Sequence, residues 1–189
     1  MVVSVVFKAF DINIYIMTEG DILERLWDII DKENIEVRYR DFSMLPEDIY
    51  GLYLYDPRFG PLIVLDKNLR HSHRLHKCIL AEEIGHFYTA ARTSILSVHT
   101  SANLKTIESQ DERKAGQWST DFLIPDRELI KALESGCRSC FELAEYFDVT
   151  EWFMYRKLGF LKMCFRRTGL KVKGRDLFDI AMLPCYLNS

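Results

Sequence analysis

The spacing of apolar residues changes at about Asn68, and this change limits the folds that the chain can adopt. Before Asn68, an expected helix over residues 22–33 is followed by short runs with the alternating pattern of strands. The expected strands cover residues 35–40, 50–56 and 61–65, and a turn at residues 57–60 joins the last two into a hairpin. After Asn68 the spacing is helical throughout, with expected helices over residues 72–91, 104–120, 126–134, 140–147 and 151–162. This order of elements predicts an α+β fold with a small antiparallel sheet, rather than a parallel α/β fold.

The N-terminal segment lacks the features of an export signal or a membrane anchor. Residues 1–17 are apolar but are interrupted by Lys8 and Asp11, and they have neither a basic leader nor a small-residue cleavage site. The segment is also too short and too charged to span a bilayer. Residues 10–16 alternate in the manner of an edge strand, and a start of translation at Met17 is the alternative reading. We therefore expect a cytoplasmic protein with no membrane partner.

Charge and cysteine content exclude several classes of protein. The 189 residues carry a net charge of −3, which gives no general attraction to nucleic acid or anionic lipid. Residues 156–175 hold eight basic residues and no acidic one, either as a solvated face or as a docking surface for an acidic partner. Of the five cysteines only Cys137 and Cys140 lie close together, so reduced thiols are expected rather than a disulfide framework. We expect a main domain over residues 1–125 and a helical unit with a basic tail over residues 126–189.

Ionisable residues on the expected helix over residues 72–91 have the spacing of a metal site. Glu82 and His86 lie one turn apart on one face, and Glu83 lies beside them. The arrangement is that of the His-Glu-x-x-His helix of metallopeptidases, with Glu82 in place of the first histidine. An acidic pair before a histidine is more often a solvated helix face. The surrounding residues are apolar, however, and Gly85 in mid-helix indicates close approach of another backbone or a ligand.

Three segments of the chain resemble the ImmA/IrrE family of metallopeptidases in order and spacing. The first covers residues 80–88 and contains the Glu-Glu-x-x-His motif. The second covers residues 112–118 and continues into the Leu-Ile-Pro sequence at residues 123–125. The third covers residues 142–150 and is more generic. The whole resemblance spans residues 20–162, and it implies a zincin-like fold and an intracellular metallopeptidase whose substrates are helix-turn-helix repressors.

The resemblance also implies roles for four residues. Glu83 matches the general base, His86 matches a metal ligand, and Glu112 matches the carboxylate ligand from the following helix. Glu82 occupies the place of the first histidine ligand. The implied cofactor is one divalent metal ion, with zinc as the first expectation and manganese as the alternative, because a second carboxylate favours harder ions.

Several neighbouring residues leave alternatives open. Asp111 and Glu108 could replace Glu112, since the phase of that helix is uncertain from sequence. His76 lies two turns before Glu83 and is expected to be an ordinary surface histidine, with tuning of Glu83 as the alternative. No role is expected for His71, His73 or His99.

Residues 141–158 also have the pattern of a helix-turn-helix, with Arg156 and Lys157 on the second helix. Aromatic residues dominate that helix, so packing or repressor docking is favoured over base recognition. The expected function is therefore metal-dependent cleavage of a helix-turn-helix repressor from a phage or mobile element. The alternatives are an anti-repressor that binds the repressor without cutting it, and a DNA-binding regulator that uses the C-terminal helices.

Overall fold

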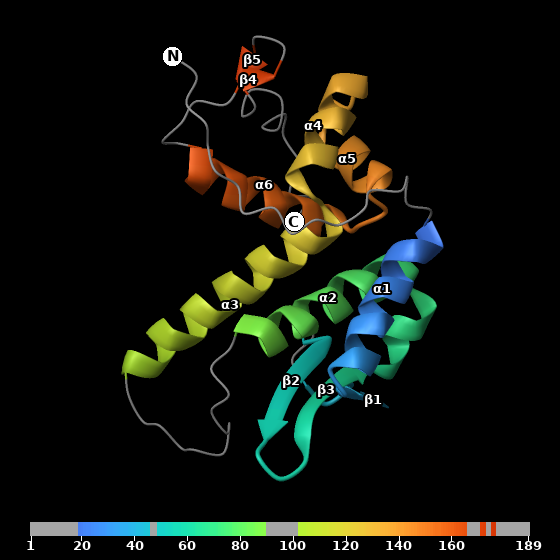
Figure 1. Ribbon diagram of the computed structural model, residues 1–189, viewed down its shortest axis with the longest axis vertical. Coiled ribbons are helices and arrows are strands. Elements are labelled where there is room, and N and C mark those ends of the chain that lie inside the picture. The colour runs from blue at the N-terminus through green and yellow to red at the C-terminus, as the bar shows by residue number, and fades with distance from the viewer. Residues whose placement is uncertain (1–18, 46–48, 90–101, 166–170, 173–174, 177–189) are drawn as a thin grey trace.

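Figure 1 shows the computed structural model, which describes residues 19–45, 49–89, 102–165, 171–172 and 175–176. A small sheet with helix α1 lies at one end, the helices α4–α6 lie at the other, and α2 and α3 run between them (Figure 1). The fold is α+β, as the order of sequence patterns predicts. The expected strand within residues 10–16 lies outside the described residues.

The N-terminal part of the fold is a helix followed by a three-stranded sheet. Helix α1 covers Glu19–Lys32, and the strands are β1 (Glu36–Arg40), β2 (Gly51–Asp56) and β3 (Gly60–Asp66). A short 3-10 helix, Lys67–His71, follows β3.

The sheet is mixed, with the order β1-β3-β2. Strands β2 and β3 form the expected antiparallel hairpin, which turns at residues 57–60 with Gly60 at φ +85°. Strand β1 pairs parallel with β3, so the expectation of a purely antiparallel sheet is wrong for this strand. Ile63 and Leu65 of β3 are both fully buried, so β3 takes the central position and separates the two strands that precede it in sequence.

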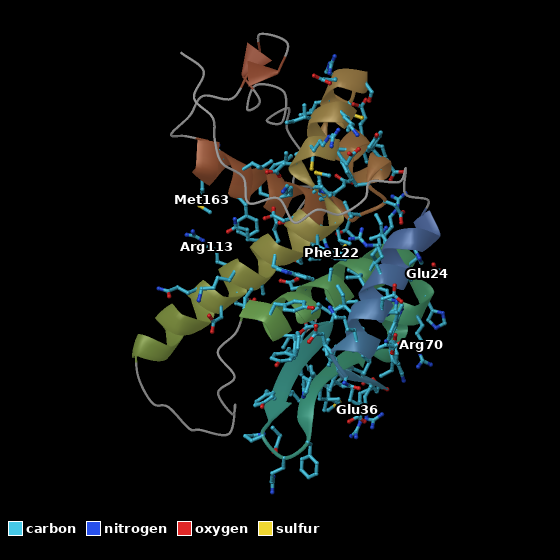
Figure 2. The ribbon with its side chains drawn as sticks, in the orientation of Figure 1. Glu24, Glu36, Arg70, Arg113, Phe122 and Met163 are labelled. Atoms are coloured by element: carbon cyan, nitrogen blue, oxygen red, sulfur yellow. The ribbon has the colours of Figure 1, made fainter. Side chains whose placement is uncertain are left out.

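Helix α2 (His73–Thr89) is the central element of the core. It packs against α1, β2 and β3 on one side and crosses α3 (Ala102–Leu123) on the other. Its residues Leu80, Ala81 and Ile84 are fully buried, as is Leu26 of α1. The C-terminal end of α3 reaches α1, where the Arg25 guanidinium lies 4.9 Å from the centroid of the Phe122 ring (Figure 2). Because α2 is buried both on the side of the sheet and on the side of α3, its sequence shows no strongly amphipathic pattern.

The C-terminal helices are α4 (Asp126–Ser135), α5 (Cys140–Tyr146) and α6 (Glu151–Phe165). The expected capping box at the start of α5 is present, since the Ser139 side chain accepts from the Glu142 backbone N–H and the Glu142 carboxylate accepts from the Ser139 N–H. Two short antiparallel strands, β4 (Lys171–Val172) and β5 (Arg175–Asp176), follow α6. None of the helices in the described segments is long and apolar enough to cross a membrane.

An ionic cluster joins the N-terminal half of α2 to the turn between α5 and α6. The Lys77 ammonium is buried and lies 2.6 Å from Asp148 Oδ2, while Arg74 Nε lies 2.6 Å from Asp148 Oδ1. Arg74 also pairs with Glu145 at the end of α5. The division into residues 1–125 and 126–189 stays a prediction, and the two parts share one apolar core as well as these ion pairs.

Candidate metal centre

Two neighbouring helices bring together three side chains that can ligate a metal. Glu82 and His86 come from α2, one turn apart, and Glu112 comes from α3. One ligand atom from each residue lies within 4.8 Å of those of the other two, and the Nε2 atom of His86 is 3.6 Å from Oε1 of Glu112. A tetrahedral zinc ion with bonds of about 2.0–2.2 Å holds its ligand atoms roughly 3.4 Å apart, so small side-chain movements complete the donor set.

The mutual charges of this cluster suit a cation. Burial lowers the pKa of His86, but the hydrogen bond to Glu112 and the nearby carboxylates outweigh burial and raise it overall. The same hydrogen bond, donated by His86, lowers the pKa of Glu112 against the opposing effect of burial. Glu112 therefore stays ionised, and the imidazole faces carboxylates that a metal ion can share.

Glu83 lies beside the three candidate ligands and is more buried than any of them. Its side chain rests against the backbone of β2, where a Cβ added to Gly51 would lie 2.5 Å from Glu83 Oε1. Burial, partly offset by the positive charge of His86 and by a hydrogen bond from the Tyr53 backbone, raises the pKa of Glu83 to about 8. A carboxyl with a pKa near neutrality, next to a metal centre, has the property that a general base requires.

The crossing of α2 and α3 depends on Gly85. A Cβ at this position would lie 2.5 Å from the Ala115 carbonyl oxygen, so only glycine lets the two backbones come this close. The close approach that mid-helix glycine indicates is therefore contact with another backbone. Since Glu112 lies one turn before Ala115 on α3, this crossing brings Glu112 next to His86.

Arg156 of α6 also reaches the candidate centre, whereas the sequence placed it only in the basic run of residues 156–175 and on the second helix of the helix-turn-helix pattern. Its Nη1 donates to Oε1 of Glu82 over 2.6 Å. The two residues are 74 positions apart, so no local spacing could reveal the pair. The only sequence signal was a second mid-helix glycine, Gly116, where an added Cβ would lie 2.2 Å from Arg156 Nη2.

The other residues named from the sequence lie elsewhere. His76 is half-buried rather than a surface residue, and its Nε2 lies 2.9 Å from the Tyr39 hydroxyl. Asp111 pairs with Lys114 on its own helix, and the side chain of Glu108 is outside the described residues. His71 is exposed, His73 lies 3.5 Å from Asp148, and His99 is outside the described residues. In the described part of the chain, Cys137 and Cys140 join no group of potential metal ligands.

The helix-turn-helix pattern corresponds to α5, the turn and α6. Phe153 and Met154 are fully buried, so half of the aromatic and apolar side chains on α6 pack inward. Lys157 is also buried and lies 2.6 Å from Asp121 of α3. Its basic neighbour Arg156 is held by Glu82, so the two cations that would face DNA point into the protein.

A helix with Glu-Glu-x-x-His in place of the usual His-Glu-x-x-His, crossed by a second helix that brings a carboxylate close to the histidine, has the arrangement of the zincin-like class of metallopeptidase folds. The model of one particular family, the IrrE N-terminal-like domain (Peptidase_M78), matches residues 30–158, and the chain belongs to this family. No curated protein and no solved structure matches the chain at a significant level.

Proposed function

We propose that the protein is a metal-dependent endopeptidase that cleaves a helix-turn-helix repressor in the cytoplasm. Membership of the Peptidase_M78 family indicates a peptidase of the metal-dependent type. The observation that carries the finer proposal is the convergence of Glu82, His86 and Glu112 beside the buried Glu83. Zinc is the expected ion and manganese the alternative, because two carboxylates and one imidazole suit both.

Each residue of the centre has a distinct task in this proposal. Glu82, His86 and Glu112 would hold the metal, which supplies Lewis-acid polarisation of the scissile carbonyl and of a water molecule. Glu83 accepts a proton from that water, while the water oxygen bonds to the carbonyl carbon. When the C–N bond breaks, the protonated Glu83 gives the proton to the leaving amine. Burial raises the pKa of Glu83 in the metal-free protein, and the positive charge of a bound metal ion would lower it again, so that Glu83 can be ionised when it accepts the proton.

Strand β2 offers a means of aligning a peptide at this centre. Among the described residues, β2 pairs with β3 on one side only, so it is the edge of the sheet. An extended peptide adds to such an edge through main-chain hydrogen bonds. The Tyr53 backbone already donates to Glu83, so a peptide along β2 runs past the proposed base.

The repressor as substrate rests on the resemblance of the sequence to the ImmA/IrrE family. The anti-repressor alternative, binding without cleavage, has one observation in its favour: Glu82 is engaged by Arg156, and a strong ion pair can weaken a metal ligand. The internal positions of Arg156 and Lys157 weigh against the DNA-binding alternative.

The test is cleavage of a helix-turn-helix repressor, taken from the neighbouring gene where that gene encodes one, with purified proteins and added zinc or manganese. We expect discrete fragments with the unaltered protein and a loss of most turnover with Glu83→Gln, since an amide cannot accept the proton from water. The metal content of Glu83→Gln should be unchanged. Cleavage at the unaltered rate by this variant would refute the role of Glu83, and repressor binding without cleavage by the unaltered protein would favour the anti-repressor.

A further inference from the structure

Glu82, one of the candidate ligands, forms an ion pair with Arg156 of α6. The side chain of Glu82 is only 13% exposed, and its Oε1 accepts from Arg156 Nη1 at 2.6 Å. A carboxylate has two oxygens with several lone pairs, so one oxygen can bind a metal ion while the other accepts a hydrogen bond from a guanidinium. The ion pair is therefore compatible with a role for Glu82 as a ligand.

The surroundings of Arg156 hold its guanidinium in place on two sides. On α3, an added Cβ at Gly116 would lie 2.2 Å from Nη2, so glycine provides the space that the guanidinium occupies. On α6 itself, the guanidinium carbon lies 5.5 Å from the centroid of the Trp152 ring, a favourable cation–π distance. These contacts fix the guanidinium and, through it, the carboxylate of Glu82.

The net charge of the candidate metal centre indicates a role for the pair of Glu82 and Arg156. Two carboxylates and a neutral imidazole carry a charge of −2, whereas a centre with two histidines and one carboxylate carries −1. Adding the Arg156 cation restores −1. The pair of Glu82 and Arg156 together thus has the net charge of the neutral histidine that the usual motif places at position 82.

We propose that Arg156 is a positioning residue of the metal centre: it orients Glu82 through Oε1 and balances its charge, so that the pair replaces a histidine ligand. This inference rests on the metal site of the proposed function. Substitutions that act on Arg156 should therefore affect metal binding differently according to whether residue 82 is glutamate or histidine.

The experiment is a double-mutant cycle on metal affinity. Metal-free full-length protein is titrated with zinc in competition with a chromophoric chelator, for the unaltered chain, Arg156→Gln, Glu82→His and the double variant. With Glu82 present, Arg156→Gln should weaken zinc binding by about tenfold or more, the usual effect of losing a group that orients a ligand. With Glu82→His, Arg156→Gln should instead strengthen binding, since an unpaired guanidinium beside the site only repels the ion.

A second variant tests the same idea without removing a charge. Gly116→Ala displaces the guanidinium while keeping Arg156, although its Cβ also lies 3.3 Å from the Phe160 ring of α6. It should weaken zinc binding when residue 82 is glutamate and have little effect when it is histidine. Arg127→Gln, which removes an exposed charge on α4, is the matched control and should change zinc affinity in neither background. Thermal unfolding of every variant confirms that it is folded.

The outcomes separate the inference from the proposed function. If Arg156→Gln changes affinity by the same factor and in the same direction in both backgrounds, Arg156 does not position Glu82. If it strengthens binding in both, Arg156 competes with the metal for Glu82, and the inference is overturned while the metal site stands. If none of the four proteins of the cycle binds zinc or, in a parallel titration, manganese, the metal site itself is refuted, and the inference falls with it.

Discussion

The buried carboxyl of Glu83 predicts how the stability of the metal-free protein depends on pH. The pKa of Glu83 rises from 4.5 to about 8 in the folded state, chiefly because the side chain is buried beside α2 and β2. The folded state therefore keeps this proton over a pH range in which the unfolded state releases it. The stabilising contribution is fully present below pH 4.5 and is lost as the pH rises to about 8.

The size of the loss follows from the same shift in pKa. At about 1.4 kcal/mol for each pH unit, the change from 4.5 to about 8 corresponds to roughly 5 kcal/mol. Glu83→Gln removes the titrating group while keeping its shape, and the Gln carbonyl can still accept the hydrogen bond from the Tyr53 backbone.

The measurement is chemical unfolding of both proteins, freed of metal by a chelator, at intervals from pH 5 to pH 9. We expect the variant to gain stability relative to the unaltered protein as the pH rises, by about 3–5 kcal/mol over the whole range. His86 and Glu112 titrate in both proteins; because Glu83 also raises the pKa of His86, the comparison measures Glu83 together with its coupling to His86. Parallel curves across this range would show that Glu83 is not a proton-holding buried carboxyl, and the assignment of the base would lose its physical support.

Three further predictions concern a candidate ligand, the crossing of α2 and α3, and the buried ion pair of Lys77 and Asp148. His86→Ala should reduce the metal content from about one ion per chain to a small fraction, measured by elemental analysis, because a site with only three protein ligands cannot lose one. Gly85→Ala should lower the free energy of unfolding by about 1–3 kcal/mol, since its Cβ meets the Ala115 carbonyl; a variant as stable as the unaltered protein in denaturant would contradict the close crossing. Asp148→Asn should destabilise the protein by about 3–5 kcal/mol in the same assay, because the buried ammonium of Lys77 loses its counter-ion; an effect below about 1 kcal/mol would mean that Lys77 is not buried as a cation.

The elements with strong local signals could be predicted from the sequence. The helical spacing after Asn68 identifies α2 to α6 with boundaries close to those observed, because each helix has an apolar face or a clear cap. The hairpin at residues 57–60 is likewise local, as it needs only a turn between two apolar runs. The apolar residues around the Glu-Glu-x-x-His motif indicated that Glu83 is buried.

The remaining features depend on contacts that no local pattern encodes. Whether β1 forms a parallel or an antiparallel pair depends on whether β3 or β2 is its neighbour, and the alternation within β1 is the same for either pairing. The role of Arg156 required knowledge that α6 packs across α3, since its partner Glu82 is 74 positions away. Family resemblance, rather than spacing, singled out Glu112 from the acidic residues of α3.

The two charged contacts of α2 have a consequence for how the protein can be divided. Glu82 and Lys77 lie on the same helix, and their partners Arg156 and Asp148 both lie after residue 147. A fragment that ends at residue 125 would hold two largely buried charges of opposite sign without counter-ions, at a cost of several kcal/mol each. The helix that carries the candidate ligands therefore gains part of its stability from the segment after residue 147. A nascent chain should acquire a competent centre only after α6 has left the ribosome and docked.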